Sequence, residues 1–207
     1  MTAALDTLLA DLSACRLCRD APRFGAALPH EPRPVIQAAP TARILIAGQA
    51  PGTRVHASGK PFTDPSGDRL RHWMGVDTAA FYDASRIAIV PMGHCFPGLD
   101  AKGGDLPPRK ECAPRWRAPI LASLTELKLI LVIGHYARDW HLPERKVESL
   151  TQTVMAWREI GMAHDKPRII PLPHPSWRNS GWLKKHPWFE AELLPVLRQE
   201  VMALSKF

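Results

Sequence analysis

The chain has 207 residues and a formal net charge of +7, and 45% of its residues are hydrophobic. This composition excludes an intrinsically disordered chain and a disulfide-held miniprotein, because it supplies enough apolar material for a globular core. No apolar run reaches the roughly 18 residues of a membrane span, and acidic residues near the N-terminus are unlike a secretory signal. We therefore expect a cytoplasmic protein with no membrane partner. The positive charge favours an acidic partner, with nucleic acid first.

The N-terminal segment is predicted to be a docked amphipathic helix that ends near residues 15–18. Its leucines recur at i, i+3, i+4 and i+7, which places them on one helical face: Leu5, Leu8, Leu9 and Leu12. Proline is abundant, with 21 residues in the chain. Several of these lie in residues 21–42, where they exclude a helix or a central strand because each removes a backbone donor and fixes φ. We expect an ordered extended segment there.

Four short runs of β-branched and aliphatic residues predict strands covered on both faces, at residues 43–47, 86–90, 128–133 and 168–172. Helices are expected at residues 66–74, 114–124, 148–160 and 187–204, with a kink at Pro195 in the last. Strands that alternate with helices predict an α/β fold. We expect one three-layer α/β/α domain over residues 1–207, with a central four-stranded, mainly parallel sheet, acting as a monomer.

The loops after the strands are the predicted location of a site, because ligands bind outside the carboxyl ends of strands in open parallel sheets. The first loop, Gly48-Gln49-Ala50-Pro51-Gly52, matches neither a dinucleotide fingerprint nor a phosphate loop. Its glycines allow the backbone to approach a small planar ligand, and the Gln49 amide can both donate and accept hydrogen bonds. An ordinary tight turn is the alternative interpretation.

His174 follows the last predicted strand and lies between Pro173 and Pro175. The prolines restrict its backbone, so the ring is aimed at whatever lies beyond the strand end. A histidine held there can donate a hydrogen bond to an oxygen that gains negative charge, or carry a proton. A structural histidine is the plainer alternative.

The stretch SWRNSGWLKKHPW after His174 interleaves basic and aromatic residues. Cations neutralise phosphates while aromatic faces stack on bases, so this mixture is typical of a nucleic-acid-binding edge. The alternative is a solvated basic loop whose tryptophans fold back into the core, which we favour for Trp188.

Four cysteines occur as two pairs, Cys15 with Cys18 and Cys95 with Cys112. In a cytoplasmic protein they are buried, reactive or bound to metal rather than joined in disulfides. The C-x-x-C of the first pair closes an amphipathic helix, unlike a thioredoxin-type motif. Four thiolates suit tetrahedral zinc or a [4Fe–4S] cluster, and the spacing leaves both open beside four unrelated buried cysteines.

Together these features resemble the uracil-DNA glycosylase superfamily, most closely its iron–sulfur-containing family 4 type. The resemblance spans most of the chain and depends on the order of its motifs, since no single one is specific. In chain order they are Cys15-Arg16-Leu17-Cys18, Gly48–Gly52, Gly59-Lys60-Pro61-Phe62 through Gly67, Cys95 with Cys112, and His174-Pro175-Ser176.

The resemblance implies that DNA containing uracil or another deaminated base is the partner. It implies that Phe62 stacks on the extruded base, that Gly48–Gly52 lines the pocket, and that His174 faces the uracil O2. It also implies a [4Fe–4S] cluster, with zinc as the alternative, on Cys15, Cys18, Cys95 and Cys112. The residues after His174 are then expected to contact DNA: Ser176, Trp177, Arg178, Asn179, Lys184 and Lys185.

The chain departs from the family pattern at three places. The first loop has Gln49 where family 4 usually has glutamate and Ala50 where family 1 has aspartate, so this loop holds no general base. Pro91 replaces an asparagine that usually reads the base, and Phe96-Pro97-Gly98 replaces a usual asparagine-containing stretch. We therefore expect His174 and backbone donors to stabilise the leaving base, Gln49 to position a water, and three residues to shape the pocket: Met92, Gly93 and His94.

The leading hypothesis is a DNA glycosylase that hydrolyses the N-glycosidic bond of uracil, or of a related deaminated base, to start base excision repair. A non-catalytic iron–sulfur module that binds damaged or single-stranded DNA is the alternative. A zinc-stabilised hydrolase of small nucleosides is a third possibility, which the positive charge disfavours.

Overall fold

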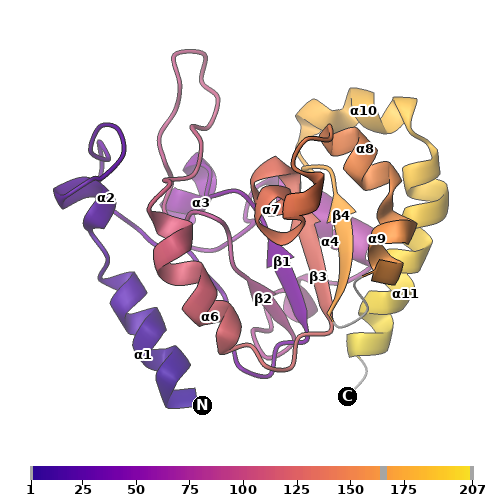
Figure 1. Cartoon of the computed structure of the whole chain (residues 1–207), viewed down its shortest axis with the longest axis horizontal. Coiled ribbons are helices and arrows are strands. Elements are labelled where there is room, and N and C mark those ends of the chain that lie inside the picture. The colour runs from indigo at the N-terminus through magenta and orange to yellow at the C-terminus, as the bar shows by residue number, and fades with distance from the viewer. Residues whose placement is uncertain (1, 164–166, 206–207) are drawn as a thin grey trace.

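The computed structural model describes residues 2–163 and 167–205 and has a four-stranded sheet at its centre (Figure 1). The strands are β1 (Ile44–Ala47), β2 (Ile87–Ile89), β3 (Leu129–Ile133) and β4 (Arg168–Leu172). Their order across the sheet is β2-β1-β3-β4, and every neighbouring pair is parallel. The four predicted strands are confirmed, and the sheet is entirely parallel.

Helices surround this sheet, and most of them are short. The first half of the chain contains α1 (Thr2–Ser13), α2 (Leu17–Asp20), α3 (Thr53–Ser58), α4 (Pro65–Met74) and α5 (Thr78–Phe81). The second half contains η1 (Ala113–Arg117), α6 (Ala118–Ala122), α7 (Gly134–His141), η2 (Pro143–Arg145), α8 (Leu150–Met155), α9 (Trp157–Ala163), η3 (Trp177–Asn179), α10 (Ser180–Lys185), η4 (Phe189–Leu193) and α11 (Leu194–Ser205). Within the described ranges, no helix has the length and apolarity needed to cross a membrane.

The two faces of the sheet pack against different helices. Ile44 and Ile46 of β1 belong to a core shared with α4 and α11, whereas Leu45 and Ala47 belong to a second core shared with α1 and α6. Successive side chains on a strand point to opposite faces, so every residue of β1 is buried. The predicted α/β architecture, with helices around a central sheet, is therefore confirmed.

Three predicted helices are less regular than expected. The helix predicted at residues 148–160 is divided at Ala156 into α8 and α9. Wide π-type turns, η1 and η4, precede α6 and α11, which carry Pro119 and Pro195 in their first turns. Proline lacks the N–H that continues an α-helical ladder, which explains why the irregularity lies before each proline rather than at a sharp kink.

The proline-rich segment is ordered and extended, as expected. Gln37 forms an isolated antiparallel bridge with Ile89, and its side chain donates to the carbonyl oxygens of Phe81 at 3.0 Å and Ile87 at 2.7 Å. These contacts hold residues 35–38 along β2, at the edge of the sheet. The segment therefore supplies hydrogen-bond partners to the backbone of the edge strand β2, whose N–H and C=O groups would otherwise be unpaired.

Candidate functional site

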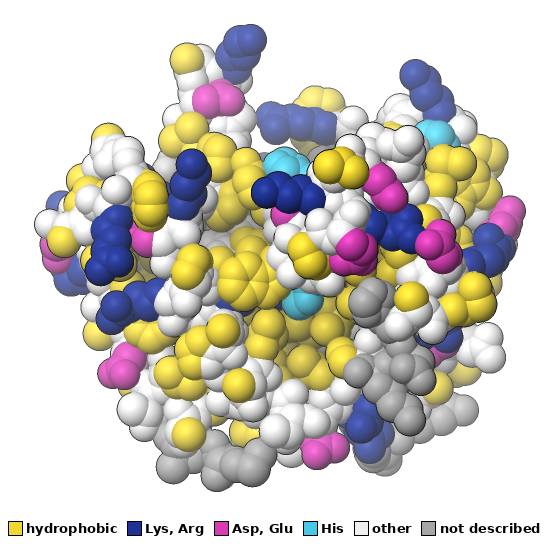
Figure 2. Space-filling view, in the orientation of Figure 1, with side chains coloured by type: hydrophobic (Ala, Val, Ile, Leu, Met, Phe, Trp, Pro, Cys, Tyr) yellow, Lys and Arg dark blue, Asp and Glu magenta, His cyan; other side chains and the backbone are white. Residues whose placement is uncertain are grey.

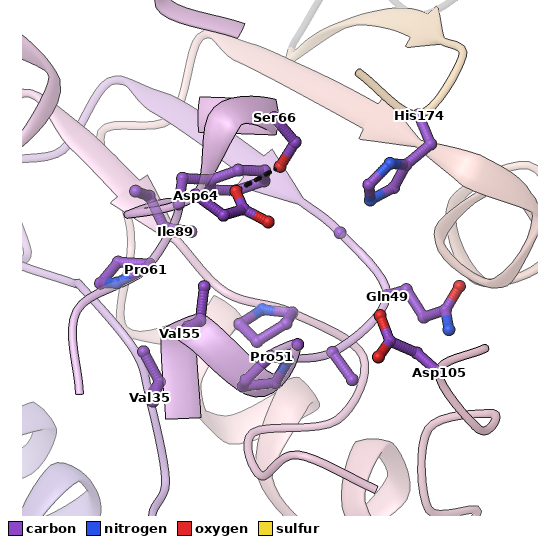
Figure 3. Close-up of a pocket in the computed structure, with 15 residues that line it drawn as sticks. Val35, Gln49, Pro51, Val55, Pro61, Asp64, Ser66, Ile89, Asp105 and His174 are labelled. Atoms are coloured by element: carbon purple, nitrogen blue, oxygen red, sulfur yellow. Dashed lines mark hydrogen bonds between the residues drawn. The ribbon is translucent and has the colours of Figure 1, made fainter. Parts of the chain in front are cut away.

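A pocket lies at the carboxyl ends of the strands, where the sequence places it (Figure 3). Its wall includes Gly48–Gly52 after β1, Pro91 after β2 and His174 after β4. The loop after β3 differs from the prediction, because Gly134 starts α7 directly and is not among the lining residues. A φ of 79° at Gly134 allows this abrupt turn.

One wall of the pocket is the ring of Phe62, held in a strained backbone. Phe62 has a φ of 53°, which is unusual for a residue with a side chain. Its carbonyl oxygen accepts from the Tyr82 hydroxyl at 3.2 Å and lies so close to Gly67 that an added Cβ would be 1.9 Å away. At the opposite wall, a Cβ on Gly48 would lie 3.9 Å from Phe62 Cζ. Because Gly48 and Gly67 have no side chains, they leave room for a narrow slot beside the Phe62 ring.

The His174 ring is oriented by the loop that carries it. Its Nδ1 accepts from the Ser176 backbone N–H at 3.2 Å, and its carbonyl oxygen accepts from the Asn179 amide at 2.7 Å. Burial lowers the pKa of His174, so the ring is neutral at pH 7. Because Nδ1 is an acceptor, the proton of the neutral ring lies on Nε2. His174 therefore offers one N–H donor to the pocket.

Two carboxylates that sequence reasoning missed face the same cavity as His174, Asp64 and Asp105 (Figure 3). Asp64 accepts from the Ser66 hydroxyl at 2.6 Å and the Gly67 N–H at 3.3 Å, and so caps α4. Asp105 lies against Gly52, where an added Cβ would be 3.4 Å from its Oδ2, and partial burial raises its pKa. The capping turn was the available signal for Asp64, whereas no local pattern marks Asp105.

Asp105 belongs to a hairpin, residues 97–107, that projects from the body of the molecule (Figure 1), and Asp105 lines the pocket. Leu99 bridges Asp105, and the carboxylate of Asp100 accepts from the backbone N–H groups of Lys102 at 2.8 Å and Gly104 at 2.9 Å. Gln49 Nε2 donates to the Leu106 carbonyl oxygen at 3.4 Å. The predicted catalytic glutamine therefore fastens the hairpin that carries Asp105.

A groove continues from the pocket between the hairpin and the loop after His174. Ser176, Trp177 and Arg178 line the groove, as does Arg54 of α3, and Trp177 is 73% exposed. Figure 2 shows Lys and Arg side chains gathered in the upper half of this face. Lys184 and Lys185 are exposed on α10 but are not among the residues that line the groove.

The other two tryptophans of the SWRNSGWLKKHPW stretch pack inward. Trp182 and Trp188 pack against the core of α4 and α11, and Trp182 Nε1 donates to the Thr151 hydroxyl at 2.8 Å. The core interpretation of Trp188 is thus confirmed. Trp182, which the interleaved pattern placed on the nucleic-acid edge, belongs with it, because the helix α10 turns it away from the groove.

These features agree with a comparison with known protein families. The sequence model of the Uracil DNA glycosylase superfamily matches residues 36–198. The chain belongs to this superfamily. The matched region includes the first loop, Phe62, Cys95, Cys112 and His174, so the superfamily resemblance drawn from motif order is confirmed.

The three residues predicted to shape the pocket of this glycosylase-superfamily member lie elsewhere, and one of them, His94, is fully buried and lines a second cavity. Met92 packs in the core of α1 and α6, and Gly93 lines the same second cavity as His94. The other two, Met92 and Gly93, contact the first loop through their backbones. Their backbone N–H groups donate to the carbonyl oxygens of Gly48 and Gln49, both at 2.9 Å. The residues therefore brace the first loop from behind, while Ile89 and Pro91 of the same segment reach the pocket.

The second cavity is lined by all four cysteines: Cys15, Cys18, Cys95 and Cys112. None forms a disulfide. Burial raises the thiol pKa to about 11 at Cys18 and to about 12 at Cys95 and Cys112, so these thiols hold their protons unless a metal displaces them. Within residues 2–163 and 167–205, no three metal-binding side chains converge closely enough for a single ion. The four cysteines share this cavity, so they are the candidate ligands of a metal group.

Proposed function

We propose that this chain is a DNA glycosylase that hydrolyses the N-glycosidic bond of uracil, or of a related deaminated base, in DNA. The observation that carries the proposal is His174, a neutral imidazole whose Nε2–H faces a pocket walled by Phe62 and the first loop. Superfamily membership supports the same chemistry. A glycosylase must take its base out of the stack into such a pocket, at a cost of a few kcal/mol.

The leaving base is stabilised by His174. As the bond between the sugar C1′ and the base N1 breaks, its electron pair passes into the uracil ring and negative charge builds on O2. The Nε2–H of His174 donates to that oxygen, which lowers the barrier without transferring the proton. A neutral donor suits this role, because burial disfavours the charged imidazolium.

Asp105 is the group we assign to the attacking water. Gln49 and Ala50 cannot accept a proton, and Asp64 already accepts two hydrogen bonds as the cap of α4. The carboxylate of Asp105 lines both the pocket and the groove, at the mouth where water enters. The water oxygen bonds to C1′ and its proton passes to Asp105, whose raised pKa makes it a stronger base than a solvated aspartate.

We also propose that Cys15, Cys18, Cys95 and Cys112 hold a [4Fe–4S] cluster. All four line one cavity, and none of them forms a disulfide. Four cysteine thiolates are the ligand set of a [4Fe–4S] cluster, and they also suit a tetrahedral zinc ion, which is the alternative. When bound, the group supplies a covalent link between the segment after α1 and the segment after β2. This assignment places the chain nearest the family 4 type.

The DNA strand is proposed to lie in the groove, with Ser176, Arg178 and Arg54 near its phosphates and Trp177 against a neighbouring base. Lys184 and Lys185 are placed to add longer-range attraction. The alternative of a non-catalytic binding module was motivated by the absence of a carboxylate in the first loop. Asp64 and Asp105 supply carboxylates from other segments, so that motivation is removed.

The test is base excision from oligonucleotides that carry a single uracil, in single- and double-stranded form, followed by alkaline cleavage of abasic sites. The wild-type protein should cut at the uracil. Asp105→Asn and His174→Ala should each lower the rate by about 10²–10³-fold while still binding the oligonucleotide. Asp83→Asn, in a turn at the opposite end of the sheet, is the matched control. Absence of cleavage with uracil and every other deaminated base would overturn the proposal.

A further inference from the structure

Arg69 of α4 reaches across to the loop that carries His174. Its Nη1 donates to the Ser176 carbonyl oxygen at 2.8 Å, and its Nη2 donates to the Ser180 hydroxyl at 3.3 Å. Ser176 directly precedes the short helical turn η3, and Ser180 directly follows it. A single planar guanidinium therefore holds both ends of this turn, which suits its fixed fork of N–H donors.

The helix α4 gives Arg69 a rigid support. The next residue, Leu70, is buried, as are Trp73 and Met74 of the same helix, in the core shared with α11. Side chains in a close-packed core keep one arrangement, so the backbone that carries Arg69 stays in place. The residues of η3, by contrast, are exposed or only half-buried. The loop therefore depends on its contacts with α4 for its position.

Ser176, which Arg69 holds, is also the residue that orients the His174 ring. The Ser176 N–H donates to His174 Nδ1 at 3.2 Å, while the carbonyl oxygen of Ser176 accepts from Arg69. An imidazole whose Nδ1 accepts a hydrogen bond carries its proton on Nε2, in a ring that here points into the pocket (Figure 3). If Ser176 moves, the ring loses this bond and is free to turn or to take the other tautomer.

We infer that Arg69 is a positioning residue, which fixes the His174 ring in the tautomer and orientation that place an N–H donor in the pocket. For its effect on catalysis, this inference rests on the proposed function. The described residues that line the pocket and the groove do not include Arg69, so it acts through Ser176 and not on the DNA. A misplaced donor stabilises charge on the departing base less well, and a loss of about tenfold in rate is expected.

The structural test compares Arg69→Gln and Arg69→Lys with the wild-type protein, each isotope-labelled at nitrogen. Proton–nitrogen correlation spectra of the histidine rings report the tautomer at neutral pH, and the His174 signals are those that disappear in His174→Ala. The wild-type ring should show an unprotonated Nδ1 and a protonated Nε2, whereas Arg69→Gln should show a mixture of tautomers. Arg69→Lys should recover only part of the effect, because lysine restores a donor but not the fork.

Kinetics on a single-stranded oligonucleotide with one uracil separate positioning from other roles of Arg69. We expect Arg69→Gln to lower kcat about tenfold with little change in KM. In a His174→Ala background the same substitution should have no further effect, because residues that act as a unit are not additive. Arg198→Gln is the matched control, since Arg198 Nη2 also donates to a backbone carbonyl oxygen, that of His72 at 3.1 Å, and should change neither constant.

Wild-type tautomer signals in Arg69→Gln would overturn the inference. An equal loss of rate in the wild-type and His174→Ala backgrounds would do the same, because it indicates a general structural role. So would a change confined to KM with a weaker salt dependence, which indicates a contact with a DNA phosphate. If Arg69→Gln fails to fold, Arg69→Lys decides by the same measurements. Absence of excision by the wild-type protein would overturn the proposed function, and the tautomer spectra would still decide whether Arg69 positions the ring.

Discussion

Phe62 and Gly67 show how single residues determine the shape of the pocket. The left-handed φ of Phe62 is a conformation that costs on the order of 1–3 kcal/mol for a residue with a Cβ. It is held by Tyr82, and by Arg71 Nη1, which donates to the Phe62 carbonyl oxygen at 3.4 Å. Gly67 is required because that carbonyl occupies the space where a side chain would begin. The backbone strain therefore lies at Phe62, the residue whose ring forms a wall of the pocket.

Gly67→Ala should disrupt this arrangement. The new Cβ would lie 1.9 Å from the Phe62 carbonyl oxygen and 2.7 Å from the carbonyl carbon, and backbone cannot move aside as a flexible side chain can. We expect a loss of about 3 kcal/mol or more in the free energy of unfolding, with a strong loss of uracil excision. Urea denaturation and the excision assay measure the two effects.

Gly181→Ala is the matched control for this substitution. Gly181 lies within α10, and a Cβ added there would meet no described atom within 4 Å beyond the backbone of its own helix. Alanine should therefore be neutral or slightly stabilising at this position. Equal unfolding midpoints for Gly67→Ala and the wild-type protein would contradict the steric argument.

At the scale of elements, the hairpin of residues 97–107 determines where Asp105 lies. Its turn is stabilised by Asp100, which accepts from two backbone N–H groups, and its base is fastened by Gln49. The hairpin has little core beneath it, since Leu99 and Leu106 are both exposed. Its conformation therefore depends on these few polar contacts.

Asp100→Ala should therefore lower the excision rate by about tenfold, or roughly 1.4 kcal/mol of transition-state stabilisation, because the turn loosens and Asp105 is less well held. The thermal unfolding midpoint should hardly change, since the hairpin lies outside the core. Asp83→Ala removes a comparable turn, in which Asp83 Oδ1 accepts from the Ser85 N–H at 3.0 Å, far from the pocket. An equal loss of activity in both variants would argue against a specific role for the hairpin.

The elements and the site differ in how far the sequence alone predicts them. Strands such as β1 are predictable because continuous apolar runs leave few other structures, and His174 is predictable because it follows one of them directly. The position of Asp105 is not predictable, because it depends on the conformation of a hairpin, and no periodic pattern in the sequence indicates that conformation. The sequence places Met92 in the pocket because its segment follows β2, but which way a loop side chain points depends on tertiary packing.

At the scale of the whole molecule, the pocket and the cysteine cavity share one segment. Residues 91–95 run from the pocket wall at Pro91 to Cys95, and the buried Arg117 donates to the Pro91 carbonyl oxygen at 3.3 Å. The same segment braces the first loop through Met92 and Gly93. Disturbance of the cysteine cavity should therefore reach the pocket without any direct contact between them.

Loss of the proposed cluster, by Cys112→Ser or by oxidative removal of iron, should lower both the unfolding midpoint and uracil excision. The physical reason is that the segment before Cys95 loses its anchor and the first loop loses its support. Iron content, circular dichroism and excision rates are measured on the same preparation. Full activity in iron-free, folded protein would contradict the coupling.

Buried neutral histidines make the stability of the whole fold depend on pH. Burial lowers the pKa of His141 to about 3, with the contacting Arg117 adding to the effect, and burial also lowers the pKa of His174. The unfolded chain then binds protons that the folded chain does not, so stability is complete above pH 6.5 and falls as the pH drops toward the folded values. At about 1.4 kcal/mol per pKa unit, His141 alone contributes on the order of several kcal/mol.

We expect the urea midpoint to decrease steadily from pH 7.5 to pH 5, above the range in which carboxylates with lowered pKa, such as Asp83, titrate. His141→Gln should flatten this slope, and a midpoint that is constant over the same interval would show that these histidines take up protons without unfolding the chain.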